Sequence, residues 1–285
     1  MIPAAFDYAK ASSVDEALDL LAADGSRALA GGHSILPLLK LRLAHADRLV
    51  DIGGLAELKG VAAHDGGLRI GALTTYRELL DSALVSQGYP LLAEATDRIA
   101  DLQVRNRGTV GGGVAHADPA SDMAGILLAL DAAFVLRSRG GTRTVASRDF
   151  FRGAFTTALA PGELLTEIVL PPLPAGAGTA YAVQEQAASG YPIAGVAAVV
   201  RRSAGGCDHV AVGVNGVADA AYRAAATEAT LRGTAGDAAA IAAAAARVAE
   251  GVRVQGDIHA PAEYRAHLVS VMAGRALERA IARSA

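Results

Sequence analysis

The sequence predicts an α+β protein whose N-terminal region mixes helices with strands and whose C-terminal region places strands before helices. Two observations predict this class. Segments with helix-capping signals alternate with short apolar runs through residues 1–176, and three strand-like segments precede three helical ones in residues 177–285. With 285 residues, 52% of them hydrophobic, the chain is long enough to bury the cores of two or three packed units.

The first subdomain is expected over about residues 1–56. The spacing S-x-x-E at Ser13 and Glu16 predicts a helix that begins with a capping box. The strand RALA, a turn at Gly31 and Gly32, the segment ILPLLKLRL and the strand RLVDI follow in that order. These residues therefore predict a strand, turn, helix and strand, with the glycines at the turn.

The second subdomain is expected over about residues 57–176. It begins with the strand LRIGA, a helix with a capping box at Thr75 and Glu78, and a helix opened by Pro90. A glycine run comes next, and PASDMAGILLAL after it predicts another helix. AAFVLRS and GTRTVAS predict paired strands, and LLTEIVLPPLP predicts a strand that ends in prolines, which cannot donate to a strand ladder. We expect a domain boundary at these prolines.

The C-terminal domain is expected over residues 177–285. TAYAVQEQAA, YPIAGVAAVV and HVAVGVNGV are strand-like and separated by turns, which predicts a three-stranded antiparallel sheet. Helices are expected near residues 221–231, 238–252 and 261–282. The alanine-rich middle helix needs no functional explanation, because alanine is simply a good helix former.

Composition and motifs exclude several classes of function. The net charge of −3 and the lack of a Lys/Arg cluster argue against nucleic acid as a partner. No G-x-x-x-x-G-K-[ST] motif occurs, and the segment GHSIL lacks the second glycine of G-x-S-x-G. Cys207 is the only cysteine, so neither an internal disulfide nor a four-thiolate cluster can form within the chain. The seven histidines show no metal-ligand spacing, and no metal site is expected.

Apolar patterning argues against a membrane protein. Uninterrupted apolar runs such as AGILLAL stay far short of the ~20 residues that a membrane-spanning helix needs. The start MIPAAFDYAK lacks the basic and apolar regions of a secretory signal. A cytoplasmic location is therefore expected.

Two glycine stretches carry the strongest functional signal. ALAGGHSILPLLKLRL covers residues 28–43, and RGTVGGGVAHADPASD covers residues 107–122. Glycines at a strand-to-helix turn let successive backbone N–H groups point into one concavity, where they bind phosphate without a cationic side chain. Two such turns suit the diphosphate of a dinucleotide. No strict G-x-G-x-x-G occurs, which argues against a Rossmann site.

Polar residues accompany both stretches. Ser34 and Thr109 supply hydroxyls, and Asp118 and Asp122 can accept hydrogen bonds from ribose or ring groups. A structural explanation stays open for each stretch, since glycines also make tight turns in close-packed proteins. It stays open for Asp118 too, because an aspartate before proline is a good helix N-cap.

Longer segments around these glycines resemble a known family. LAGGHSILPLLKLRL and DLQVRNRGTVGGGVAHADPASD are similar to the FAD-binding medium subunit of the molybdenum hydroxylases, the group of carbon monoxide dehydrogenase and xanthine dehydrogenase. FFRGAFTTALAPGELLTEIVLP, ASGYPIAGVAA and AEYRAHLVSVMAGRAL extend the resemblance over the full chain. It implies a fold of the vanillyl-alcohol-oxidase (PCMH) type, with two N-terminal α+β subdomains that bind FAD and a C-terminal domain of a three-stranded antiparallel sheet and helices.

The resemblance also implies which residues bind FAD. Main-chain amides of the two stretches hold the pyrophosphate, and the residues concerned are Ala30, Gly31, Gly32, His33, Ser34, Thr109, Gly111, Gly112 and Gly113. Asp122 matches a carboxylate that contacts the ribityl or ribose portion of the cofactor. Ile99 and Leu165 match positions that line the cofactor. The segment from Tyr191 to Ile193 matches the one that approaches the isoalloxazine ring.

Two positions depart from the family pattern. Gly113 stands where relatives usually carry asparagine, so one side-chain hydrogen bond to the flavin region is expected to be absent. Gln184 stands where some relatives carry a lysine near the flavin, and the lost charge is expected to alter the flavin potential. Neither change removes the expected phosphate site.

The function implied by the resemblance is electron transfer within a heterotrimer. A molybdopterin-binding large subunit oxidises the substrate, and a small subunit with two [2Fe–2S] clusters passes the electrons to FAD in this chain. From there they go to an acceptor such as NAD, a quinone or oxygen. No catalytic acid or base is expected in this chain, and the substrate is chosen by another subunit. Two alternatives stay open: a stand-alone flavoenzyme with its own small substrate, and a docking subunit without FAD.

Overall fold

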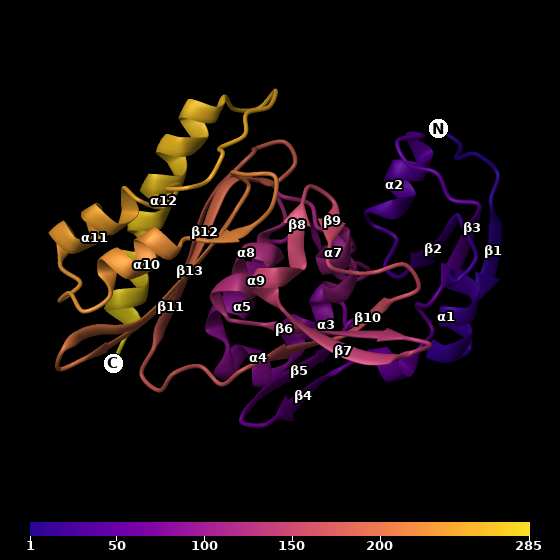
Figure 1. Ribbon diagram of the computed structural model, residues 1–285, viewed down its shortest axis with the longest axis horizontal. Helices are drawn as coiled ribbons and strands as arrows, with labels where there is room; N and C mark the ends of the chain where they lie inside the picture. Colours follow the sequence, from indigo (N-terminus) through magenta and orange to yellow (C-terminus); the bar gives the residue numbers. More distant parts are fainter.

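The computed structural model describes all 285 residues and places three sheet-based units along the long axis of the molecule (Figure 1). The N-terminal unit (residues 7–51) and the C-terminal unit (residues 178–285) lie at opposite ends, with the central unit (residues 56–170) between them. The predicted α+β class is confirmed. None of the helices has the length and apolar character that a membrane span requires.

The N-terminal unit is a three-stranded parallel sheet with a helix after each of its first two strands. Its elements are β1 (Asp7–Lys10), α1 (Val14–Leu21), β2 (Ser26–Leu29), α2 (Ile35–Lys40) and β3 (Arg48–Asp51), and the strand order is β1-β3-β2. The expected order of strand, turn, helix and strand is present. Strand β1 was not predicted, because its residues are largely exposed and show no apolar alternation.

Capping signals located helix starts correctly, with one error of detail. The Ser13 hydroxyl accepts the Glu16 amide at the start of α1, as expected, but the Glu16 carboxylate accepts from the Ser12 amide rather than from that of Ser13. The capping box there is therefore only half formed. At α3 (Tyr76–Asp81), Thr75 and Glu78 form the complete box.

The central unit is a five-stranded antiparallel sheet with helices packed on it. In spatial order its strands are β4 (Val61–His64), β5 (Gly67–Gly71), β10 (Leu164–Leu170), β6 (Ala133–Ser138) and β7 (Gly141–Ala146). Besides α3, its helical segments are η1 (Ala56–Leu58), α4 (Ala83–Gly88), α5 (Pro90–Arg98), α6 (Leu102–Arg105), α7 (Val110–His116), α8 (Asp122–Ala129) and α9 (Ser147–Phe150). A short hairpin of β8 (Phe151–Gly153) and β9 (Thr156–Thr157) follows α9. The sheet and helices enclose a core of 29 buried residues, among them Leu91, Phe134 and Ile168.

The second glycine stretch forms a helix and not the turn that was expected. Thr109 is the N-cap of α7, and the three glycines lie in its first turn. The next helix, α8, begins at Asp122 rather than at Pro119. It starts late because the Asp118 carboxylate accepts the Ala120 amide in a turn, so Asp118 is not the N-cap of this helix.

The C-terminal unit holds four antiparallel strands, so the expected number of three was wrong. They are β11 (Gly178–Glu185), β12 (Pro192–Ser203), β13 (Gly206–Asn215) and β14 (Tyr222–Arg223), paired in sequence order. Strand β14 has two residues, too few for a periodic pattern to mark it. Helices α10 (Ala225–Leu231), α11 (Ala238–Ala245) and α12 (Ala262–Arg283) follow, and α11 ends well before the expected residue 252.

The C-terminal sheet is buried on both faces. Along β12, Ala197 packs into the core of the central unit, while Val196 and its same-face neighbours pack with α12. Successive strand side chains point to opposite faces, so the near-continuous apolar run of β12 fits a sheet that is covered on both sides. Helix α8 comes very close to β13, since a Cβ on Gly213 would overlap the carbonyl oxygen of Gly125. The sheet is thus sandwiched between α8 and α12.

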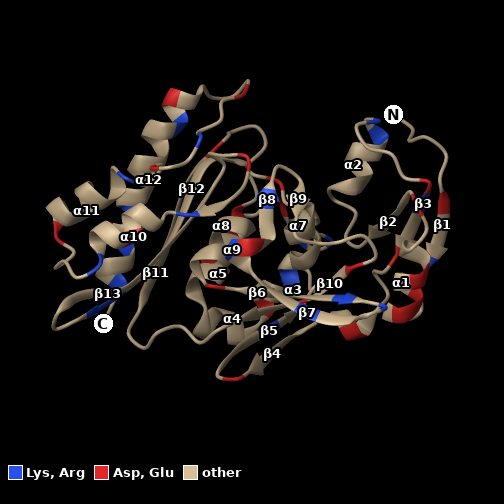
Figure 2. Cartoon of the chain, in the orientation of Figure 1, with Lys and Arg blue, Asp and Glu red and all other residues tan.

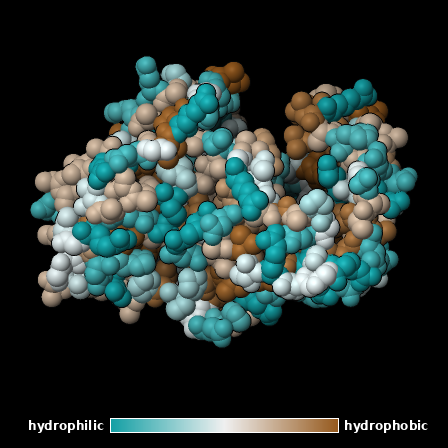
Figure 3. All heavy atoms as spheres, in the orientation of Figure 1, coloured by the Kyte–Doolittle hydropathy of each residue, from teal (hydrophilic) through white to brown (hydrophobic).

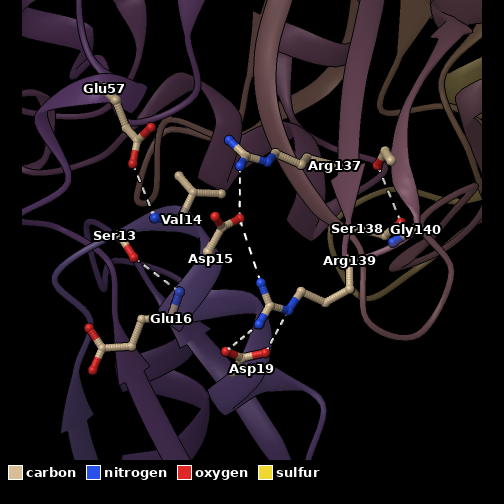
Figure 4. Close-up of polar contacts among 11 residues, drawn as sticks. Ser13, Val14, Asp15, Glu16, Asp19, Glu57, Arg137, Ser138, Arg139 and Gly140 are labelled. Carbon is tan, nitrogen blue, oxygen red and sulfur yellow. Dashed lines mark hydrogen bonds and ion pairs between the residues drawn. The ribbon is translucent and has the colours of Figure 1, made fainter.

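Ion pairs join the N-terminal unit to the central unit. Asp15 and Asp19 on α1 face two arginines at the end of β6 (Figure 4). Figure 2 shows the acidic positions along α1. The closest N···O distance is 2.8 Å between Asp15 and Arg137 and 2.6 Å between Asp19 and Arg139. The four side chains are between 37% and 58% exposed, so water and salt screen these pairs.

We expect the double substitution Asp15→Asn and Asp19→Asn to lower the free energy of unfolding by less than about 1 kcal/mol, because exposed ion pairs add little stability. Urea denaturation of the purified chain at low and at high salt measures this. The difference between variant and wild type should shrink as salt rises. A loss of several kcal/mol that salt does not change would contradict the expectation.

Candidate functional site

The two glycine stretches touch each other in the folded chain. Gly31 lies against the backbone of Arg107 and Gly108, where a Cβ on Gly31 would overlap the Arg107 carbonyl oxygen. A Cβ on Gly112 would lie 3.9 Å from the Cβ of Ala30. The contact lies between the N-terminal and central units, where the surface is hollowed on the face shown in Figure 3. The structure therefore brings together two segments that are far apart in the sequence.

The first stretch presents backbone amides that have no acceptor. None of the N–H groups from Ala30 to Ser34 donates a hydrogen bond within the chain, and the ladder of α2 begins with the Leu36 amide. Gly32 has φ of 80°, a left-handed conformation that glycine adopts without strain and that can turn neighbouring amides toward a common point. Unpaired amides in a half-buried bend need an outside acceptor. The bend is therefore suited to an anion such as phosphate.

The second stretch uses its glycine amides internally. Those of Gly111 and Gly113 donate to the carbonyl oxygens of Ala72 and Thr109, at 2.9 and 3.0 Å, and that of Gly112 donates to the Thr109 hydroxyl at 3.2 Å. A Cβ on Gly111 would overlap Ala72 at the end of β5. These glycines thus allow close packing, while the amide of Thr109 itself donates to no group in the chain.

A half-buried carboxylate lies at the start of α8. Asp122 accepts a hydrogen bond of 2.6 Å from the hydroxyl of Tyr181, which comes from β11 in the C-terminal unit. Burial raises the pKa of Asp122 from its usual 3.8 to about 6, although the hydrogen bond from Tyr181 lowers it. Glu185 raises the pKa further and Arg98 lowers it, each through its charge. Asp122 is therefore protonated more readily than an ordinary aspartate.

Two further tyrosines surround this carboxylate. Burial raises the pKa of Tyr76, and the nearby Asp122 and Tyr191 reinforce the effect. The pKa of Tyr191 is raised by partial burial and then by the carboxylates of Asp118 and Asp122. Tyr191 keeps 51% of its surface exposed, so one side of its ring is free to contact a ligand. Phenol groups and one carboxylate thus gather where α3, α8 and the C-terminal sheet meet.

The remaining predicted site residues lie at varying distances from this cluster. Ile99 is the half-buried C-cap of α5, and Leu165 is buried in β10, both against the core that also contains Val110 of α7. The carbonyl oxygen of Ile193 accepts from the Arg265 guanidinium at 2.9 Å. Gln184 is exposed, and its amide donates to the carbonyl oxygen of the next residue. The Gln184 side chain forms no hydrogen bond with the glycine stretches.

Histidines within the two stretches make contacts with the protein. The Nε2 atom of His33 lies 3.4 Å from the carbonyl oxygen of Gln103 in α6, which holds the first stretch against the central unit. The ring of His116 packs on Phe155 with 5.1 Å between the ring centres, and burial lowers its pKa. No cluster of three or more His, Cys, Asp or Glu side chains could hold a metal ion.

Sequence reasoning missed several residues of this site. Tyr76 follows a recognised capping residue, and Tyr181 lies in a recognised strand, but neither position carries a local signal for ligand binding. Arg98 and Glu185 form an ion pair of 2.8 Å that joins the end of α5 to the end of β11. These four side chains come from elements far apart in the sequence. Only packing brings them together.

Two family models match the chain. One, described as the FAD binding domain in molybdopterin dehydrogenase, matches residues 4–173. The other, described as the CO dehydrogenase flavoprotein C-terminal domain, matches residues 179–280. Together they cover nearly the whole chain.

Individual relatives agree with these matches. The carbon monoxide dehydrogenase medium chain of Afipia carboxidovorans is 39% identical over 100% of this chain and 99% of its own length. The glyceraldehyde dehydrogenase medium chain of Sulfolobus acidocaldarius is 42% identical over 79% of this chain and 80% of its own length. The solved carbon monoxide dehydrogenase of Hydrogenophaga pseudoflava matches with a TM-score of 0.97 and 40% identity, covering 100% of both chains.

Proposed function

Because this chain belongs to the family of FAD-binding medium subunits of the molybdenum hydroxylases, we propose that it carries electrons from the [2Fe–2S] clusters of a partner subunit through FAD to an external acceptor. The family assignment and the full-length structural match confirm the expected FAD-binding fold, the FAD cofactor and membership in an oxidoreductase complex. The partners, the acceptor and the residues that hold FAD are parts of the proposal.

The observation that carries the proposal is the set of unpaired amides from Ala30 to Ser34. Their position against the second glycine stretch fits a ligand with a diphosphate, because a diphosphate offers many acceptor oxygens in a short span. We assign the FAD pyrophosphate to this bend and to the free amide of Thr109. Gly111, Gly112 and Gly113 let the second stretch pack closely beside the bend, because a Cβ on them would overlap Ala72, the Thr109 hydroxyl and the Tyr76 hydroxyl.

Side chains around Asp122 would hold the rest of the cofactor. Asp122 accepts from Tyr181 and has a second carboxylate oxygen available for a ribityl or ribose hydroxyl. The exposed part of the Tyr191 ring, with Ile193 after it, offers a surface for the isoalloxazine, and Ile99 and Leu165 supply apolar lining. Bound FAD supplies a ring that takes up electrons singly and releases two together. The chain itself positions the ring and excludes water, and no residue is assigned a catalytic proton transfer.

The complex that we propose also contains a molybdopterin-binding large subunit and a small [2Fe–2S] subunit. NAD, a quinone or oxygen would take the electrons, and we place the complex in the cytoplasm. Medium chains named for carbon monoxide dehydrogenase and for glyceraldehyde dehydrogenase are similarly close to this chain, at 39% and 42% identity. This similarity supports our view that another subunit selects the substrate.

Flavin content of the purified chain is the first test. We expect a yellow protein with flavin absorbance and about one FAD per chain, released on denaturation and identified by chromatography. Apo protein prepared by FAD removal should recover the absorbance when FAD is added back. A correctly folded chain that neither holds nor rebinds FAD would instead be the docking subunit without a cofactor.

Partner subunits and electron flow are the second test. Affinity purification of the tagged chain from its own cells should yield two further chains, and elemental analysis should find molybdenum and iron with them. Chemical reduction of the iron–sulfur clusters in the complex should bleach the flavin absorbance, and an added acceptor should restore it. Turnover of a small substrate by the isolated chain, with no partner present, would favour the stand-alone flavoenzyme.

A further inference from the structure

The hydroxyl of Tyr76 is a polar group at the candidate site that has no role in the fold. Tyr76 opens α3 and is only 7% exposed. Its ring packs beside the second glycine stretch, where a Cβ on Gly108 would lie 3.1 Å from a ring carbon. Its hydroxyl reaches the first turn of α7, and a Cβ on Gly113 would overlap the hydroxyl oxygen. The side chain thus covers the glycine stretch from Gly108 to Gly113.

No group of the chain forms a hydrogen bond with this hydroxyl, unlike the other two buried tyrosine hydroxyls of the central core. Tyr89 donates to the carbonyl oxygen of Pro171 at 2.8 Å, and Tyr181 donates to Asp122 at 2.6 Å. The Tyr76 hydroxyl oxygen is not one of the fully buried polar atoms that lack a partner, so it keeps access to the outside of the chain and a ligand can reach it. The Tyr76 hydroxyl is therefore suited to a partner outside the chain.

The surroundings of the hydroxyl identify the site that it faces. Its charged and titratable neighbours are Asp122 and Tyr191, both of which belong to the proposed FAD site. Gly113 lies in the glycine stretch that lines the same site. The hydroxyl thus lies among residues from α7, α8 and the loop before β12 that we assign to one ligand.

We propose that the Tyr76 hydroxyl forms a hydrogen bond with bound FAD and that Gly113 lacks a side chain because this hydroxyl occupies the space. The proposal rests on the proposed function, since it takes FAD as the ligand of this site. Tyr76 is then a cofactor-binding residue. Its aromatic ring contributes packing that phenylalanine would keep, and only the hydroxyl contributes binding.

The phenylalanine variant separates these two contributions. We expect Tyr76→Phe to raise the dissociation constant of FAD about three- to tenfold, the change that corresponds to the net loss of one neutral hydrogen bond. The melting temperature of the FAD-free protein should stay nearly the same, because the variant removes a hydroxyl that forms no hydrogen bond within the chain. Titration of apo protein with FAD, followed by flavin fluorescence, measures the first quantity, and thermal unfolding measures the second.

Tyr89→Phe is the matched control. It removes a hydroxyl from an equally buried tyrosine whose hydrogen bond to Pro171 lies within the fold. We expect it to lower the melting temperature and to leave the dissociation constant of FAD unchanged. If Tyr89→Phe weakened FAD binding as much as Tyr76→Phe, the effect would be a general loss of stability and the proposal would fail.

A double-mutant cycle with Gly113→Ala tests the spatial part of the proposal. In the wild-type background the new methyl group overlaps the Tyr76 hydroxyl, so FAD binding should weaken by at least as much as in Tyr76→Phe. In the Tyr76→Phe background the nearest ring carbon would lie 3.7 Å from the methyl group, an ordinary contact, so the additional loss should be smaller. Strictly additive effects would overturn the assignment of Gly113.

Failure of this proposal can be told apart from failure of the proposed function. A wild-type chain that binds no FAD would overturn both, and in that case none of the variants would need to be compared. A wild-type chain that binds FAD, with Tyr76→Phe binding it equally well, would overturn the assignment of Tyr76 alone.

Discussion

Replacing Gly31 by alanine is expected to abolish retention of FAD. The added methyl group would overlap the carbonyl oxygen of Arg107 and come within about 3 Å of Gly108, so the two glycine stretches would have to move apart. Backbone atoms cannot rotate away as a flexible side chain can, and overpacking of this kind costs typically about 1–3 kcal/mol. The protein should remain folded, but the unpaired amides from Ala30 to Ser34 would no longer face the second stretch.

The measurement for Gly31→Ala is the FAD stoichiometry of the protein after gel filtration. We expect less than about a tenth of the wild-type FAD content, because the amides from Ala30 to Ser34 would lose one or more charge-assisted hydrogen bonds to the diphosphate. Gly88→Ala is the control, because a Cβ at Gly88 would meet nothing within 4 Å. It should retain full FAD content and equal or slightly higher stability. A full complement of FAD in Gly31→Ala would contradict the assignment of the pyrophosphate to this contact.

Replacing Asp122 by asparagine is expected to stabilise the FAD-free protein at neutral pH. Folding raises the pKa of this group from 3.8 to about 6, so the folded state binds its proton more tightly than the unfolded state does. The stability that this proton contributes is present below pH 3.8 and is lost as the pH rises through about 6. A shift of this size corresponds to at most about 3 kcal/mol. Asparagine keeps an oxygen that can accept from Tyr181 and carries no charge.

The pH dependence distinguishes this effect from a simple change in packing. The stability of Asp122→Asn relative to wild type should increase by about 2 kcal/mol between pH 4.5 and pH 7.5 and level off above that. Urea denaturation of both FAD-free proteins across this range measures it. Asp24→Asn, at an exposed position, is the control and should show no such trend. A difference that does not vary with pH would contradict the raised pKa.

The same substitution should weaken FAD binding, because we assign the carboxylate to a hydroxyl of the cofactor. The ionised, half-buried Asp122 carboxylate would then lower the stability of the wild-type protein at neutral pH while contributing to FAD binding. FAD titration of Asp122→Asn at pH 7.5 tests this, with Asp24→Asn again as the control. Tight binding by the variant would remove Asp122 from the proposed site without affecting the prediction about stability.

Several features of the fold were predictable because their signals lie within a few residues. The capping box at Thr75 and Glu78, the proline at the start of α5 and the prolines after β10 each marked an element boundary correctly. These signals work through contacts inside a single turn of chain. Elements without a local signal, such as β1 and β14, were missed because pairing with a distant strand defines them.

The candidate site was likewise predictable from the sequence only in part. The two glycine stretches were visible in the sequence, but the helical form of the second was not, since glycine has low helix propensity. Its first turn is supported by the Thr109 cap and by packing of Gly111 on Ala72. That the Tyr76 hydroxyl occupies the space where a side chain on Gly113 would begin could not be predicted from the sequence.

The sequence by itself determined the family, the two phosphate-binding candidates and most of the helices and strands, because these depend on residue types at short spacings. Only the tertiary structure decided that Gly31 meets Arg107, that Tyr181 of the C-terminal unit reaches Asp122, and that Tyr76 covers Gly113. Each of these contacts joins elements that are distant in the chain. Their formation depends on how complete units bury their surfaces against each other, which no short segment specifies.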